Sequence, residues 1–525
     1  MRIDRLKLPD FRNLKNFEIG FDESQPTTVI LGRNGSGKSN LIEALVEIFR
    51  DLEDGKASTF AYEISYLCHG RRIEVINEPN GKKREQYSVD GVWVSRTEFQ
   101  ALHDDVLPKH VFAYYSGWNR RLESGFDDPT RKLYKLWLDN EDRDIPLRRL
   151  FYCRKEYSQF VLLAFFLSNN PAAEKLLRDY LGIESFDSAL FVLKTPYWRG
   201  SGKPNKVQLE KGDSRFWYAR GAFKHFLDRL WQNAMAPIRN EETPERDFRG
   251  RTESVERLYL YIKDLNQLRT LSGSDSPKDF FGLLESLFLC DLIDEIRVSV
   301  QHTRAGRIRF EQLSEGEQQL LTVLGLMLFT QQDESLFLLD EPDTHLNPVW
   351  TYDFLSLLQQ NIVADKAQLL IATHNPLLIG TLRKEQVRIL SQEQGQTDGL
   401  APDEDPIGIG VEGLLKSELY GLRSTLAPEV LAKLDRHYLL LGKRDRSDDE
   451  NIELIKLAAE LNEMSVARTH PNPYFEQFAN AMARRGPEPI QGLTKEDIKA
   501  QTQLADDVMA EILAEEKAAR SEGAA

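Results

Sequence analysis

The stretch Thr27-Thr28-Val29-Ile30-Leu31-Gly32-Arg33-Asn34-Gly35-Ser36-Gly37-Lys38-Ser39-Asn40 decides the fold of this chain. Its first five residues are apolar or β-branched, which is typical of a short buried strand. A glycine-rich loop follows, and apolar residues at helical spacing then continue to Leu52. A strand, a Gly-x-x-x-x-Gly-Lys-Ser loop and a helix in this order predict a P-loop, which cradles phosphates.

The residue types in the loop suit a nucleoside triphosphate with Mg²⁺. Glycines let the backbone curl so that its N–H groups point at the phosphates. Lys38 brings positive charge to the β- and γ-phosphates, Ser39 brings a hydroxyl to Mg²⁺, and the helix adds its positive N-terminal end. The sequence therefore predicts ATP and Mg²⁺ as ligands. The predicted nucleotide-binding residues of the loop are Gly32, Asn34, Gly35, Ser36, Gly37, Lys38, Ser39 and Asn40.

A second motif, Leu336-Phe337-Leu338-Leu339-Asp340-Glu341, is an apolar strand that ends in two carboxylates. We expect Asp340, together with Ser39, to hold Mg²⁺, and Glu341 to polarise the water that attacks the γ-phosphate. The alternative is an ordinary strand that runs into an acidic turn. The P-loop upstream favours the catalytic interpretation.

The segment Leu313-Ser314-Glu315-Gly316-Glu317-Gln318-Gln319 resembles the signature sequence of ABC ATPases. Ser314 and Gly316 begin a helix, whose N-terminus can cradle a phosphate. The resemblance implies that Ser314, Gly316 and Glu317 act in trans, on the nucleotide of the opposite subunit. A Ser with a Glu three residues later is also a capping box, which uses the same N–H groups.

A histidine stands at the end of another buried strand, in Ile371-Ala372-Thr373-His374-Asn375-Pro376. His374 matches the switch histidine that contacts the γ-phosphate in the same ATPases. A lone histidine is more often structural. The strand–helix–strand distance from Asp340 and Glu341 favours a catalytic role here.

Together these motifs resemble the RecF/SMC/OLD-like branch of ABC ATPases, in which two copies close around two ATP molecules. The turn Phe11-Arg12-Asn13-Leu14 is similar to an FR-type turn of that branch, which implies that Arg12 lies near the nucleotide. A surface arginine is the alternative. Asp343–Pro348 resembles the D-loop at the dimer interface, with Asn347 where many members have Asp. Tyr114–Gly117 stands where a glutamine-containing loop is expected, and it holds no glutamine.

Alternating strands and helices predict an α/β fold, namely an ABC-type ATPase head with a helical insertion and a helical C-terminal tail. We assign 1–120 and 286–395 to the two parts of the head, 121–285 to a mostly helical insertion, and 396–525 to a linker and a helical partner-docking region. Further strands are expected in a hairpin at Arg2–Asp22, a meander at 60–95, and runs at Ile296–Val300 and Ile308–Phe310. The chain lacks a sustained heptad pattern, so the long coiled coil of SMC proteins is not expected.

The composition is that of a globular chain. Of 525 residues, 41% are hydrophobic and 29% charged. The apolar runs, such as Leu320–Phe329, are too short to span a bilayer. Cys68, Cys153 and Cys290 are scattered, which disfavours a disulfide framework or structural zinc. Since no apolar leader follows Met1, we expect a cytoplasmic protein without a membrane partner.

The net charge of −15, from 68 basic and 83 acidic residues, disfavours nucleic-acid binding over the whole surface. A local basic and aromatic patch could serve a RecF-like repair ATPase that binds DNA: Tyr197, Trp198, Arg199, Lys203, Lys206, Lys211, Arg215, Trp217, Tyr218 and Arg220. The alternative is a core helix with packed aromatic residues: Trp217, Phe223, Phe226 and Trp231. An acidic protein can also dock a basic partner.

The tail segment Val411-Glu412-Gly413-Leu414-Leu415, continued by Ser417–Thr425, is similar to PtuA-type ATPases of Septu anti-phage systems and their retron-linked relatives. The resemblance implies a Mg²⁺-dependent ATPase that regulates and holds a separate HNH nuclease of the PtuB type. It also implies a homodimer with two shared ATP sites, with a higher oligomer left open. In the retron-linked form a reverse transcriptase and its msDNA join the complex, which leaves a nucleic-acid contact open.

An OLD-like ATPase with its own nuclease is a further alternative. That nuclease needs a Glu after an apolar strand and a later Asp-x-Asp. Val411-Glu412-Gly413 is a poor candidate because Pro406–Gly410 makes a poor strand, and Asp445-Arg446-Ser447-Asp448 has the wrong spacing. We therefore expect ATP hydrolysis to ADP and phosphate, without nuclease activity.

Overall fold

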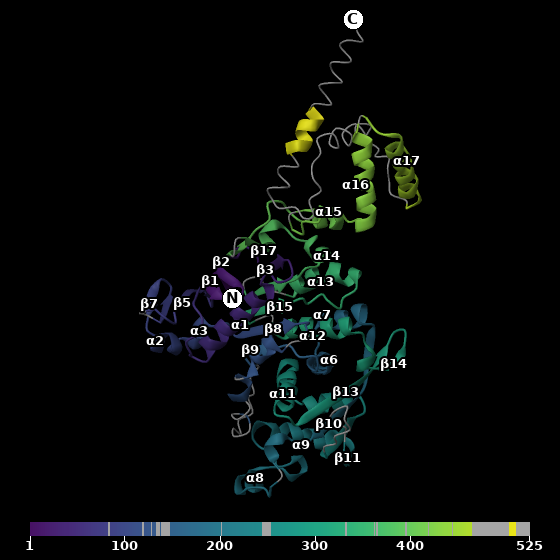
Figure 1. The fold of residues 1–525 in the computed structure, drawn as a ribbon. Coiled ribbons are helices and arrows are strands. Elements are labelled where there is room, and N and C mark those ends of the chain that lie inside the picture. Colours follow the sequence, from purple (N-terminus) through teal and green to yellow (C-terminus); the bar gives the residue numbers. More distant parts are fainter. Residues whose placement is uncertain are drawn as a thin grey trace. The chain divides into compact units, whose positions relative to one another are not determined.

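In the computed structural model the chain forms two compact units, residues 1–401 and 402–525 (Figure 1). The structure describes residues 1–81, 84–117, 120–127, 129–132, 137, 148–200, 202–243, 254–330, 333–361, 363, 366–393, 396–417, 419–443, 445–464 and 503–510. None of the helices in these ranges has the length and apolar character needed to cross a membrane.

A mixed sheet of 13 strands organises the first unit, in the order β7-β6-β5-β4-β1-β2-β18-β17-β3-β16-β15-β8-β9. Its strands are β1 (Arg2–Phe11), β2 (Leu14–Gly20), β3 (Thr27–Gly32), β4 (Tyr62–Cys68), β5 (Arg71–Asn77), β6 (Glu85–Val89), β7 (Val92–Val94), β8 (His110–Tyr115), β9 (Leu150–Tyr152), β15 (Ser335–Asp340), β16 (Ala367–Ala372), β17 (Val387–Glu393) and β18 (Gln396–Leu400). From β17 to β9 neighbouring strands pair in parallel, so their carboxyl ends share one edge.

The central strands β3, β15 and β16 are buried along almost their whole length. Continuous apolar runs of this kind fit parallel strands that are covered on both faces. Helix α1 (Lys38–Glu53) packs against β3, β8, β15 and β16. The predicted strand, P-loop and helix are therefore present, and the predicted α/β head is confirmed.

The antiparallel part of the sheet follows the sequence pattern closely. Phe11 pairs with Leu14 across the turn of the β1–β2 hairpin, and β4 to β7 form the predicted meander. Two short helices, α2 (Arg96–Ala101) and α3 (His103–Val106), lead from the meander to β8. The hairpin places its turn beside the P-loop, which matters for the site below.

A second sheet lies within the first unit. The sequence analysis predicted a mostly helical insertion and did not predict this sheet. Its order is β11-β12-β10-β13-β14, all antiparallel. Its strands are β10 (Ile183–Lys194), β11 (Met235–Glu242), β12 (Val255–Ile262), β13 (Ile293–His302) and β14 (Gly306–Arg309). The runs at 296–300 and 308–310, which we assigned to the head, thus pair with the insertion. Short apolar runs do not distinguish strand from buried helix, and only distant partners resolve them.

Helices surround these sheets: α4 (Arg121–Ser124), α6 (Tyr157–Leu167), α7 (Pro171–Lys175), α8 (Lys206–Lys211), α9 (Lys224–Asn233), α10 (Leu265–Ser272), α11 (Pro277–Leu289), α12 (Glu315–Thr330), α13 (Pro348–Gln360) and α14 (Pro376–Ile379). Helix α6 packs against both α11 and α12. The signature helix α12 is thereby fixed to the insertion as well as to the head.

The second unit contains α15 (Gly410–Lys416), α16 (Pro428–Gly442) and α17 (Asp448–Glu463). Helices α16 and α17 pack together, with Leu440 and Leu461 fully buried and Arg436 paired with Glu453 at 2.7 Å. Glu412 lies within α15, so no strand leads into it as an OLD-type nuclease would require. The rest of the predicted helical tail, 465–502 and 511–525, lies outside the described residues.

Candidate nucleotide site

The P-loop connects the end of β3 to the start of α1, and two of its glycines adopt a left-handed backbone. Gly35 has φ of +84° and Gly37, which caps α1, has φ of +106°. Other residues rarely adopt these angles. A side chain at Gly37 would also collide with Leu14 at the turn of the first hairpin. The left-handed backbone and the close approach of the Leu14 side chain therefore both favour glycine at this position.

Lys38 is buried and its ammonium lies at the centre of the loop. Its Nζ donates to the carbonyl of Gly32 at 2.8 Å and lies 4.0 Å from Oε1 of Glu341. Two nearby oxygens, Oγ of Ser36 and Oδ1 of Asp340, are buried without a hydrogen-bond partner among the described atoms. Buried polar atoms normally have partners. The donor set therefore fits a phosphate with an attached Mg²⁺ ion.

Asp340 ends the buried strand β15 and is only 2% exposed. Burial raises the pKa of its carboxyl to about 6, and the charge of Glu341 adds to this effect. The hydrogen bond from Ser39 and the charge of Lys38 act in the opposite direction. Asp340 and Ser39, the two residues predicted to hold the metal, are thus in contact.

Glu341 follows directly and has φ of +53°, a strained backbone for a residue other than glycine. Its backbone N–H donates to the carbonyl of Ala372 at 2.8 Å, which ties the turn to β16. Nδ1 of His374 lies 2.8 Å from Oε2 of Glu341. The structure therefore brings together the two residues that separate motifs predicted as catalytic.

The predicted Arg12 contacts the P-loop helix through a carboxylate. Its guanidinium pairs with Glu43 of α1, and Nε of Arg121 lies 2.9 Å from the same carboxylate. Burial raises the pKa of Glu43, although both arginines oppose the shift. Arg12 is thus held beside the loop, while its contact with a nucleotide stays a prediction.

Asn13 supports the loop directly, which the sequence analysis missed. Its Nδ2 donates to the carbonyl of Gly35 at 2.6 Å, and its Oδ1 accepts a hydrogen bond from Asn40. Asn40 in turn accepts from Arg121 at 2.8 Å. Asn13 belongs to the same turn, Phe11–Leu14, from which Arg12 was predicted, so the sequence could have indicated its position near the loop. Arg121 carries no local signal, because only the fold brings it here.

Ser314 caps α12 as the capping-box interpretation expects. Its Oγ accepts from the N–H of Glu317 at 3.3 Å, and the Glu317 carboxylate accepts from the N–H of Ser314 at 2.6 Å. A side chain at Gly316 would collide with the carbonyl of His345. The action of these residues on a second subunit stays a proposal.

The loop after Glu341 is held by hydroxyl groups. Oγ1 of Thr344 donates to the carbonyl of Glu341 at 2.9 Å and lies 3.1 Å from Oγ of Ser116. The N–H of Ser116 donates to the carbonyl of Asp340 at 3.3 Å. Ser116 therefore lies beside the acidic pair, in the loop where the resemblance implies a glutamine that this chain lacks. Asn347 caps α13 by accepting from the N–H of Trp350 at 3.0 Å.

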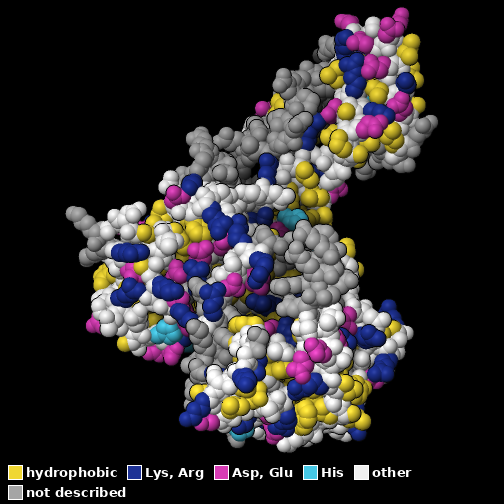
Figure 2. All heavy atoms as spheres, turned by 60° about the horizontal axis from the view of Figure 1, so that its bottom comes forward, with side chains coloured by type: hydrophobic (Ala, Val, Ile, Leu, Met, Phe, Trp, Pro, Cys, Tyr) yellow, Lys and Arg dark blue, Asp and Glu magenta, His cyan; other side chains and the backbone are white. Residues whose placement is uncertain are grey.

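The patch proposed for DNA is packed into the core only at Trp217, while Tyr197, Lys203, Lys206 and Lys211 are exposed. Trp217 is 5% exposed, and its Nε1 donates to Glu256 at 2.6 Å. Arg215 pairs with Asp213 and Asp228. On the face shown in Figure 2, basic and acidic side chains are interspersed. The packed alternative therefore holds for Trp217, Phe223 and Phe226, which are buried, and a nucleic-acid contact of the exposed lysines stays a prediction. No group of three or more His, Cys, Asp or Glu that could hold a metal occurs among the described residues.

Comparisons with known proteins also indicate an ATPase. A family model described as "AAA ATPase domain" matches residues 1–87, and one described as "AAA domain, putative AbiEii toxin, Type IV TA system" matches residues 202–380. The Septu protein PtuA of Bacillus mycoides is 29% identical over 223 residues, which are 40% of this chain and 31% of that protein. The chain thus spans about a third of this relative's length.

The retron Vc95 probable ATPase of Vibrio cholerae is 21% identical over 491 residues, which are 87% of this chain and 86% of that protein. Among solved structures, the SMC head domain from Thermotoga maritima is 14% identical with a TM-score of 0.32, and the match covers 77% of this chain and 100% of that domain. A TM-score this low supports no further inference.

Proposed function

Because the chain carries an ABC-type ATPase head and is related to the Septu and retron ATPases, we propose that it binds and hydrolyses ATP as the regulator and scaffold of an anti-phage defence complex. One observation carries the catalytic part of the proposal. Lys38, Glu341 and His374 meet at the shared carboxyl edge of β3, β15 and β16. Ligands of parallel sheets bind at this edge.

The loop residues bind and orient the triphosphate. Backbone N–H groups of the loop and the N-terminus of α1 face the phosphates, and Lys38 adds a buried positive charge. Ser39 and Asp340 would hold Mg²⁺, which supplies positive charge to the β- and γ-phosphate oxygens. Ser36 offers its unpartnered hydroxyl to the same oxygens.

Hydrolysis then requires a base beside the γ-phosphate. Glu341 accepts the proton of the attacking water through its carboxylate. His374 holds that carboxylate in place through the 2.8 Å contact at Nδ1. The strained turn at Glu341 fixes the direction of the side chain, because the hydrogen bond from its N–H to Ala372 of β16 restrains its backbone.

A second copy completes each site. Ser314, Gly316 and Glu317 stand at the start of α12, where helix N–H groups can contact a γ-phosphate. Two copies arranged head to tail would bury two ATP molecules between them, each held by the loop of one copy and the signature of the other. The order of the motifs supports this arrangement, and the phosphate would replace the capping hydrogen bonds that Ser314 and Glu317 exchange in the single copy.

The defence role rests on the related proteins. The names of two relatives associate them with Septu and retron systems. We therefore propose an HNH nuclease as the partner, with α15 to α17 as its dock, and a reverse transcriptase with msDNA in a retron-linked system. The chain would restrain or release that nuclease according to its ATP state.

Native mass spectrometry of the chain, purified from cells that also carry its neighbouring genes, tests this proposal. A complex of two or more copies with a small nuclease would support it. A chain that binds no other protein, while it still hydrolyses ATP, would contradict the defence role and leave the ATPase assignment intact.

A further inference from the structure

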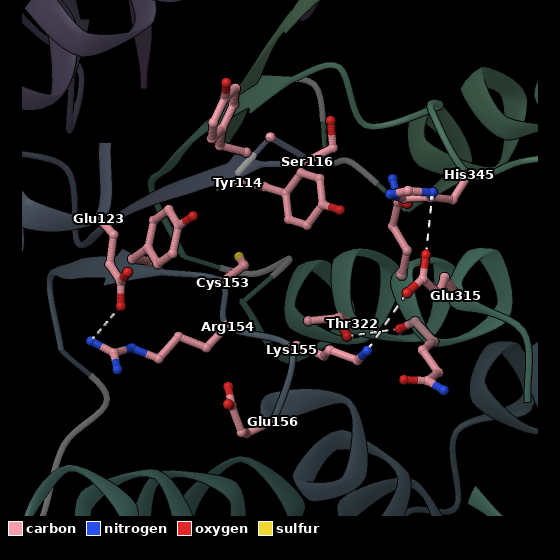
Figure 3. Close-up of a pocket in the computed structure, with 15 residues that line it drawn as sticks. Tyr114, Ser116, Glu123, Cys153, Arg154, Lys155, Glu156, Glu315, Thr322 and His345 are labelled. Atoms are coloured by element: carbon pink, nitrogen blue, oxygen red, sulfur yellow. Dashed lines mark hydrogen bonds and ion pairs between the residues drawn. The ribbon is translucent and has the colours of Figure 1, made fainter. Parts of the chain in front are cut away.

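A pocket of about 400 Å³ lies beside the nucleotide site and is separate from it (Figure 3). The end of β8, the segment Tyr152–Glu156 and the first turns of α12 line it. Its lining includes no residue of the P-loop, and neither Ser314 nor Gly316. A volume of this size suits one small ligand or one long side chain.

One buried group in the lining needs a donor. Gln319 is 6% exposed, and its Nε2 donates to the carbonyl of Pro342. This bond fixes the orientation of the amide, because a carbonyl can only accept. Oε1 of Gln319 is buried and has no partner among the described atoms. An occupant that donates a hydrogen bond would satisfy it.

The charges of the pocket favour a cation. Arg154 pairs with Glu123 at 3.1 Å, and Lys155 lies 3.8 Å from Glu315, so both basic residues are balanced. Glu156 has no charged partner among the residues that the structure describes. In Figure 3 the Glu156 side chain lies on the side of Arg154 that is away from Cys153 and Tyr114, and its carboxylate points toward Arg154. The lining itself therefore holds three carboxylates against one arginine and one lysine, and Arg120, outside the lining, pairs with Glu123 at 2.9 Å.

Tyrosine rings in the lining favour a planar cation. Tyr114 and Tyr152 both line the pocket, and aromatic faces attract cations, most often guanidinium groups. We propose that this pocket binds the guanidinium group of an arginine that a polypeptide partner inserts. A guanidinium is planar, stacks on rings and presents five donors, which match the Gln319 and Glu156 acceptors better than a compact ammonium would. A partner with exposed arginines also suits a chain with net charge −15.

The occupant would reach the catalytic loop through two hydrogen bonds. Gln319 is bonded to Pro342, directly after Glu341, and Ser116 is bonded to Asp340. Both Gln319 and Ser116 line the pocket. Binding and hydrolysis are therefore coupled, and by linkage each must affect the other. This coupling rests on the ATP hydrolysis proposed above, whereas the binding of a guanidinium group in the pocket does not depend on it.

Ligand-observed NMR titration without nucleotide tests the site, with N-acetyl-L-argininamide as the probe. The citrulline analogue has the same shape without the charge, and we expect it to bind at least about tenfold more weakly. The lysine analogue should also bind more weakly than the probe. Equal affinity of the citrulline analogue would overturn the charge recognition, and equal affinity of the lysine analogue would overturn the guanidinium assignment.

Variants locate the site on the chain. Glu156→Gln should weaken the probe by about fivefold and Glu156→Lys by more, since an exposed charge attracts less than a buried one. Glu174→Gln removes an exposed carboxylate of α7 and should leave the affinity unchanged. Equal weakening by Glu174→Gln, or none by the two Glu156 variants at unchanged melting temperature, would overturn the placement in this pocket.

Discussion

Nδ1 of His374 lies 2.8 Å from Oε2 of Glu341, although the two residues follow different strands and belong to different motifs. A carboxylate that must accept a proton from water gains from a fixed orientation, because its lone pair has to face the water. In the proposed mechanism, this contact makes His374 a positioning residue for Glu341.

Glu341→Gln should lower the turnover of ATP by at least about a hundredfold, since it removes the proton acceptor. The amide keeps the shape of the side chain, so ATP binding should persist within a few fold. Turnover and nucleotide affinity are measured separately on the purified chain. Glu74→Gln, an exposed change on β5, should alter neither. Turnover of Glu341→Gln at the level of the unmodified chain would show that another group is the base.

His374→Ala should lower kcat by about tenfold to a hundredfold with little change in KM, because it removes an orienting contact. If His374 acts through Glu341, the two changes must not multiply in one chain. We therefore expect the double variant to turn over ATP at about the rate of Glu341→Gln alone. A rate lower by the full product of the two effects would indicate an independent role for His374.

Asn13→Ala should raise the KM for ATP by about threefold to tenfold, the value of one or two hydrogen bonds to the loop. Its kcat should change little, because Asn13 holds the carbonyl of Gly35 and not the catalytic carboxylate. Steady-state kinetics over a range of ATP concentrations determine kcat and KM separately. Asn266→Ala, on the exposed side of α10, is the matched control. A fall in kcat at constant KM would contradict the supporting role.

One pH effect on stability follows from His103. Its Nε2 lies 2.8 Å from Oε2 of Glu53, and this hydrogen bond raises the pKa of His103, while burial opposes the shift. A histidine with a raised pKa in the folded state contributes stability that is full below its unfolded pKa near 6.5 and is lost as pH rises through the folded value. His103→Gln should therefore cost up to about 1 kcal/mol at pH 5.5 and less at pH 8.5.

Denaturant unfolding of the two chains at both pH values measures this difference. His225→Gln, at an exposed position of α9, controls for the loss of a histidine as such. A cost that grows from pH 5.5 to pH 8.5 would contradict the assigned direction of the shift.

Much of this site could be predicted from the sequence, because each motif lies within one contiguous segment. Lys38 and Ser39 lie in one contiguous strand, loop and helix, and Asp340 with Glu341 ends one apolar strand. The parallel pairing of β3, β16 and β15 then brings the motifs to one edge without further information. Patterns of this kind are read within one element, so they need no distant partner.

What the sequence did not show depends on contacts between distant segments. β10 pairs with β13, which lies about a hundred residues later, so its apolar run could not be told from a helix. Arg121 reaches Glu43 and Asn40 only after folding, and Ser116 meets Thr344 only because β8 and β15 are neighbours. The pocket beside α12 also depends on such contacts, since residues from five separate places in the sequence line it.

The central claim is that each ATP site is shared by two copies, and a mixing experiment tests it most directly. Lys38→Ala removes the phosphate-binding ammonium, and Ser314→Arg blocks the signature; each purified variant alone should be inactive. In a mixed dimer, one site combines the intact Lys38 of one copy with the intact Ser314 of the other. Since an equal mixture gives half mixed dimers with one such site each, we expect about a quarter of the unmodified activity for a symmetric two-site dimer. Folded variants that recover no ATPase activity on mixing would contradict the shared sites.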